Sequence, residues 1–157
     1  MNWDAVGAIA ELVGAIAVVA TIGYLAFQVR QTNRISRTNT VTDIQKRFDE
    51  INTVLLSNAE LRRVLVKEGP LESDEDDQLY AFANFVINVW ITVQNAYDNG
   101  QIERALFEGM IADVGVAHKR WPNLGIAVSK WLEEYPGMDR WELFDAHHEW
   151  CTETNKK

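Results

Sequence analysis

The chain has 157 residues, enough for one domain plus an additional apolar segment. Its single cysteine, Cys151, excludes an internal disulfide, and the formal net charge of −8 disfavours nucleic-acid partners, because phosphate binding needs a cationic surface. Apolar residues make up 47% of the sequence, so a packed core remains available after an apolar N-terminal segment is set aside.

The N-terminal segment from Val6 to Val29 is apolar on nearly every side, apart from Glu11 and Gln28. About 20 apolar residues in a helix cross the roughly 30 Å hydrocarbon core of a bilayer. A buried core helix of a soluble protein is the first alternative, but such helices normally keep a polar face. The segment therefore predicts one transmembrane helix.

A cleaved signal peptide is the second alternative for this segment. Signal peptides begin with positive charge, whereas here the positive charge follows the apolar stretch. Basic residues beside a membrane helix favour the cytoplasmic side. We therefore expect a retained anchor with its N-terminus outside, oriented by Arg30, Arg34 and Arg37.

The remainder of the chain predicts helices only, so the expected fold class is all-α. We expect a transmembrane domain over residues 1–30 and a cytoplasmic helical domain over residues 31–157. The membrane helix should continue as a stalk whose apolar face is Val41, Ile44, Phe48, Ile51 and Leu55. A break over residues 38–42, which are rich in threonine, is the alternative.

Further helices are expected between breakers that contain glycine, proline or asparagine. Asn58 should cap a short helix, and Ser73 should cap a longer one that ends before Gly100. The expected ranges are 59–67, 73–99, 102–119, 122–134 and 139–154.

Catalytic and metal-binding motifs are lacking in the sequence. His147 and Cys151 share a helix face, but zinc needs three or four ligands and the other candidate, His118, lies about 30 residues earlier. There is no Walker loop, dinucleotide turn or nucleophile elbow. We therefore do not expect the chain to be an enzyme, and we expect no metal site and no cofactor.

Glu11 is the residue that a plain membrane anchor does not need. An ionisable side chain facing lipid costs several kcal/mol, so it should face protein or water. At 100° per residue, one helix face contains Glu11 together with Asp4, Gly7, Gly14, Ala15, Val18, Ile22, Leu25 and Val29. Their spacing of three and four is typical of a helix-bundle seam, and the small residues permit close approach.

Self-association of several copies would shelter this Glu11 face. In a dimer or trimer the seam closes around Glu11. In a larger ring the same face lines a cation-conducting pore with an acidic mouth at Asp4 and Glu11, followed by an apolar constriction. A monomer whose Glu11 reaches water near the outer surface is the third arrangement.

The anchor and its junction, residues 10–19 and 24–34, resemble a widespread group of uncharacterised bacterial single-pass membrane proteins. The regions around Trp121-Pro122 and Tyr135-Pro136-Gly137 are similar to the C-terminal half of that group. The resemblance implies a bacterial inner-membrane location, with Glu11, Gln28, Arg30 and Arg34 as signature residues, and it implies no activity. We expect membrane lipid and further copies of the chain as partners. The alternative is a non-conducting scaffold whose cytoplasmic domain binds a protein.

Overall fold

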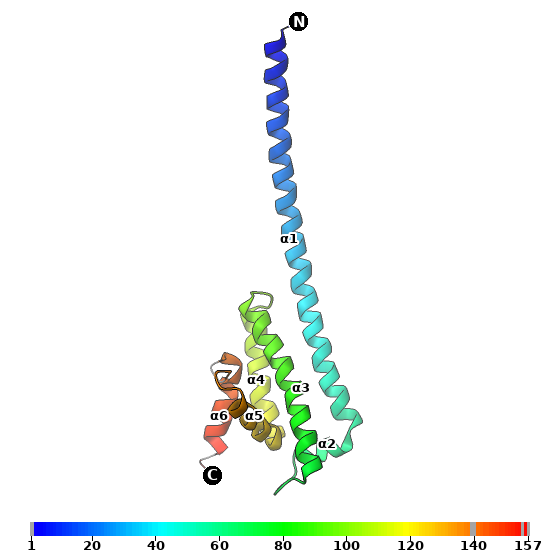
Figure 1. Ribbon diagram of the computed structural model, residues 1–157, viewed down its shortest axis with the longest axis vertical. Coiled ribbons are helices and arrows are strands. Elements are labelled where there is room, and N and C mark those ends of the chain that lie inside the picture. The colour runs from blue at the N-terminus through cyan, green and yellow to red at the C-terminus, as the bar shows by residue number, and fades with distance from the viewer. Residues whose placement is uncertain (1, 139–140, 155, 157) are drawn as a thin grey trace. The chain divides into compact units, whose positions relative to one another are not determined.

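The computed structural model describes residues 2–138, 141–154 and 156, and this part of the chain consists of helices and the short segments that connect them, without strands. The all-α expectation is confirmed. The elements are α1 (Trp3–Ser57), α2 (Ala59–Val64), α3 (Ser73–Asp98), α4 (Arg104–Arg120), α5 (Pro122–Glu134), the 3-10 helix η1 (Glu142–Phe144) and α6 (Asp145–Thr154) (Figure 1). The chain divides into two compact units, Met1–Asn39 and Thr40–Lys157.

The first unit consists of the N-terminal part of α1, which is exposed along its described length. Among the described residues, α1 is the one helix that is long enough and apolar enough to cross a membrane. Its most apolar stretch has a mean hydropathy of 2.1, and none of that stretch is buried. Its polar side chains bond locally: Thr21 Oγ1 donates to the Ala17 carbonyl at 2.8 Å, and Gln28 Nε2 donates to Tyr24 Oη at 2.8 Å. Such local bonds suit an apolar surrounding, which offers polar groups no water.

α1 runs unbroken from Trp3 to Ser57, so the threonines at residues 38–42 do not interrupt it. Thr38 Oγ1 donates to the Arg34 carbonyl at 3.1 Å, a back-bond within the helix. Beyond Asn39, the predicted stalk face packs into the second unit. Ile44, Ile51 and Leu55 are buried, and Val41 and Phe48 are partly buried against the same core.

The second unit is a helical bundle with an aromatic core. Trp90 of α3, Phe107 of α4, Trp131 of α5 and Phe144 of η1 are all buried. The ring of Phe107 stacks on Tyr97 at a centroid distance of 4.2 Å. Burial of these large side chains is the main stabilising contribution in the bundle, because each removes a large apolar area from water.

The helix ends follow the predicted breakers with two differences. Gly100 has φ +65 and Gly137 has φ +101, a backbone conformation that glycine adopts without a Cβ clash. Ser73 is the first residue of α3 and not its cap, because Glu72 and Glu75 form a capping box there. The last α-helix begins at Asp145, and residues 139 and 140 of its predicted start lie outside the described residues.

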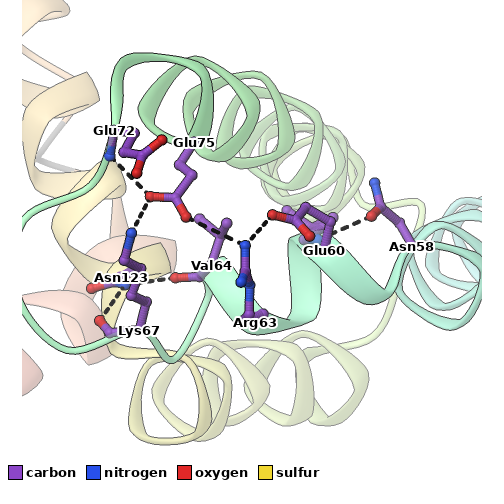
Figure 2. A network of polar contacts seen from close by, with 9 residues as sticks. Asn58, Glu60, Arg63, Val64, Lys67, Glu72, Glu75 and Asn123 are labelled. Atoms are coloured by element: carbon purple, nitrogen blue, oxygen red, sulfur yellow. Dashed lines mark hydrogen bonds and ion pairs between the residues drawn. The ribbon is translucent and has the colours of Figure 1, made fainter.

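A polar network fixes α2 and the following loop to the rest of the bundle (Figure 2). Asn58 Oδ1 accepts from the Leu61 N–H at 3.0 Å, which confirms the predicted cap. Asn123 Nδ2 donates to the carbonyls of Val64 at 2.6 Å and Lys67 at 2.9 Å. Glu75 pairs with Lys67 and lies 3.7 Å from Arg63. The Lys67 hydrogen bond and the Glu72 backbone N–H hold the pKa of the Glu75 carboxyl below its usual value.

Candidate functional site

The predicted Glu11 face lies wholly on α1 in the first unit. All its members are exposed: Asp4, Gly7, Glu11, Gly14, Ala15, Val18, Ile22, Leu25 and Val29. A Cβ built on Gly7 or Gly14 meets nothing within 4 Å. These two positions are therefore open to the close approach of another helix.

Glu11 and the three arginines of the first unit, Arg30, Arg34 and Arg37, form no ion pair within the described part of the chain. The first salt bridge along α1 is Asp43 to Lys46, at 3.6 Å. The three arginines follow the apolar segment within three turns of α1, and their role in orienting it stays a prediction.

A second candidate site, the histidine cluster, lies where α4, α5 and α6 meet in the bundle. It consists of His118 of α4, Ser129 of α5, and His147 and Cys151 of α6. His118 and His147 are buried, and Ser129 and Cys151 are partly buried. The Trp150 ring packs edge-on against His118 with a centroid distance of 5.2 Å.

The cluster forms one connected chain of polar atoms. His118 Nε2 lies 2.8 Å from His147 Nδ1, and His147 Nε2 lies 3.2 Å from Ser129 Oγ and 3.4 Å from Cys151 Sγ. Ser129 Oγ donates to the Gly125 carbonyl at 3.2 Å. We therefore assign the protons to Nε2 of both histidines, so that His118 donates to His147 and His147 to Ser129.

This assignment leaves the Nδ1 lone pair of His118, which has no hydrogen-bond partner of standard geometry in the described part of the chain. The backbone of Val114, one turn earlier in α4, raises the pKa of His118 and so partly opposes the effect of burial. It does not form a hydrogen bond of standard geometry with Nδ1. An unpaired acceptor at a buried position is less costly than an unpaired N–H donor would be.

Burial lowers the pKa of both histidines. Desolvation, followed by the proximity of His147, lowers the pKa of His118 from 6.5 to about 3. Desolvation, followed by the nearby His148, lowers the pKa of His147 from 6.5 to about 4. Both rings are therefore neutral at pH 7, which suits a polar network enclosed by aromatic side chains.

The geometry of the cluster does not suit a metal ion. His147 directs Nδ1 at His118 and Nε2 at Ser129 and Cys151, so the ligand atoms do not converge on one point. Across the residues that the structure describes, no group of three or more His, Cys, Asp or Glu side chains is placed to hold a metal. Chemically, the arrangement holds protons in a hydrogen-bonded chain between three helices.

Sequence reasoning found only part of this cluster. The four-residue spacing of His147 and Cys151 placed them on one helix face, but Ser129 was missed. A serine within an amphipathic helix carries no sign of its tertiary partner. Its role appears only once α5 is packed against α6.

Comparison of the chain with protein-family models, curated proteins and solved structures found no match.

Proposed function

We propose that this chain is a single-pass protein of the bacterial inner membrane that self-associates through the Glu11 face of α1. Its N-terminus lies outside, and the bundle lies in the cytoplasm, on the side of the membrane that Arg30, Arg34 and Arg37 favour. One observation carries the proposal: an ionisable side chain, Glu11, lies in the N-terminal half of an exposed apolar helix segment, on a face lined by glycine and alanine.

A carboxyl group that faces lipid costs several kcal/mol. The described part of the first unit is a lone helix, so it supplies no second helix to shelter Glu11. A second copy supplies one, and it also lets Gly7, Gly14 and Ala15 pack closely. Van der Waals packing and hydrogen bonds between helices are what drive association in lipid.

Mutations on opposite sides of α1 test the self-association. Glu11→Leu and Gly14→Leu should reduce the mass of the detergent-solubilised particle, measured by light scattering, because they remove the polar group and the close approach. Ala20→Leu places the same side chain 180° from Glu11 on the helical wheel, and it should leave the mass unchanged. If none of the three substitutions changed the mass of the oligomer, the Glu11 face would not be the interface.

The copy number decides whether the assembly conducts ions. In a ring large enough to leave a lumen, Asp4 and Glu11 form an acidic mouth and the apolar side chains from Val18 to Val29 form a constriction. Rings of carboxylates favour cations, and apolar constrictions gate by dewetting. A dimer or trimer leaves no lumen, so that result alone would remove the pore from the proposal.

Conductance in planar bilayers tests the pore itself. Glu11→Gln keeps the size of the side chain and removes its charge, so cation selectivity should fall. If the protein conducts with unchanged selectivity, Glu11 is not part of the selectivity filter.

A non-conducting scaffold is the alternative function. Two apolar side chains near α2 favour it, because Leu56 is 79% exposed and Val66 is 52% exposed in the second unit. Such side chains offer contacts to a protein partner. A monomeric particle that does not conduct would favour the scaffold over the self-associating assembly.

A further inference from the structure

An open pocket of about 250 Å³ lies within the second unit, where α1, α3, α4 and the start of α5 meet. We call it the Arg120 pocket. Its apolar wall includes Phe48 and Ile51 of α1, Val86 and Trp90 of α3, and Leu124 of α5. Ile51, Val86, Trp90 and Leu124 are buried in the core, so the wall is firmly held.

Two charged side chains of α4 and one amide of α1 complete the lining: Asp113, Arg120 and Asn52. The Arg120 guanidinium lies 5.4 Å from the centroid of the Trp121 ring, a cation–π contact that restrains it. Among the described residues, no carboxylate forms an ion pair with Arg120. The pocket therefore presents an aromatic wall and a guanidinium whose charge is not neutralised by the protein.

We propose that the Arg120 pocket binds a small amphipathic anion, with a carboxylate at Arg120 and an apolar ring or short chain against Trp90 and Phe48. Guanidinium groups match carboxylates through two parallel hydrogen bonds. Typical ligand pockets measure about 300–1,000 Å³, so this slightly smaller pocket suits a ligand below drug size.

Asp113 is the group that opposes an anion, and its position weakens that opposition. It precedes Arg120 by seven residues on the same helix, so their Cα atoms are about 10.5 Å apart along the axis. Asp113 and Arg120 are both exposed, so water and salt weaken the repulsion between Asp113 and an anion bound at Arg120. Arg120 is also the only one of the two that is held by a ring of the pocket wall.

Three probes that share one ring test the charge preference. The full-length protein in nanodiscs would be titrated calorimetrically with 2-naphthoate, 2-naphthamide and 2-naphthylmethylammonium, and empty nanodiscs would be subtracted. Naphthoate should bind at least tenfold more tightly than the amide, and the ammonium should bind most weakly. Failure of naphthoate to bind, or equal affinity for all three probes, would overturn the proposal.

Matched variants then locate the site. Arg120→Gln should weaken naphthoate binding about tenfold, whereas Asp113→Asn should strengthen it by removing a repulsive charge. Lys119→Gln makes the same charge change one residue away, outside the pocket lining, and should have little effect. If Lys119→Gln weakened binding as much as Arg120→Gln, the effect would be one of general charge. If Arg120→Gln strengthened binding and Asp113→Asn weakened it, the ligand would be a cation. Either result rejects the proposal.

Thermal unfolding of each variant, followed by circular dichroism, separates binding from folding. Arg120 and Asp113 are both exposed, so their variants should unfold at the temperature of the unmodified protein. Saturable naphthoate binding that survives Arg120→Gln in a folded variant would place the ligand elsewhere. The proposal does not depend on self-association of α1.

Discussion

Gly125 is the residue whose replacement has the most direct structural consequence. A Cβ added to it would lie 2.6 Å from Cη2 of Trp150, and two more atoms of the same ring would lie within 3.0 Å. That ring packs against His118 and His147, so it is not free to move away. Gly125→Ala should lower the free energy of unfolding by about 1–3 kcal/mol, the usual cost of overpacking a core.

Gly109→Ala in α4 is the matched control for this substitution. Its added Cβ meets nothing within 4 Å, so only helix propensity changes, by up to about 1 kcal/mol in favour of folding. Urea unfolding of the two variants should therefore shift in opposite directions. A Gly125→Ala protein as stable as the unmodified one would mean that Trp150 yields easily.

The buried histidine pair predicts a loss of stability in mild acid. In the unfolded chain both rings protonate near pH 6.5, but in the folded chain only near pH 3 for His118 and pH 4 for His147. Between these values the unfolded chain binds more protons, so the free energy of unfolding falls as the pH is lowered from about 6.5. Above pH 6.5 the contribution is constant.

Replacement of both histidines by leucine tests the origin of this slope. The His118→Leu, His147→Leu protein should show a shallower pH dependence of the urea midpoint between pH 7 and pH 5. The Glu75 carboxyl, whose pKa is held low by Lys67 and the Glu72 backbone, titrates below this window. An unchanged slope in the double variant would assign the pH dependence to other groups.

At the scale of elements, local signals in the sequence predicted the ends of α5 and the buried face of α1. Pro122 and the Tyr135-Pro136 breaker bound α5 as expected, and the stalk face of α1 is the buried face of the helix. These features depend on proline, capping side chains and helical spacing. All three act within a few residues, so they can be read without knowing the tertiary structure.

The errors occur where tertiary contacts decide the local structure. The chain before α6 was predicted as continuous helix, yet it forms η1 and packs Leu143 and Phe144 into the core. The N–H of Leu143 donates to Gln94 Oε1 of α3 at 3.1 Å, a bond between residues 49 positions apart. The histidine cluster and the Arg120 pocket have the same origin, because each draws its members from three or more elements.

Among the described residues of the whole molecule, buried side chains occur only in the second unit. Among the described residues, the first buried side chain is Ile44, and both apolar core clusters lie between Ile44 and Phe144. None of the described side chains before Thr40 is buried. The exposed apolar surface of residues 6–29 therefore contributes nothing to the core of the bundle, although it dominates how the full chain behaves in water.

A fragment comprising residues 40–157 should consequently fold without the membrane helix. It retains the two core clusters and the part of α1 that packs on them, so we expect a helical, cooperatively unfolding protein that is soluble without detergent. Sedimentation equilibrium should give the mass of a monomer, because the proposed interface is on the deleted segment. A fragment that oligomerises like the full chain would transfer self-association from the Glu11 face to the bundle. A fragment without a cooperative transition would show instead that the helix before Thr40 contributes to the stability of the fold.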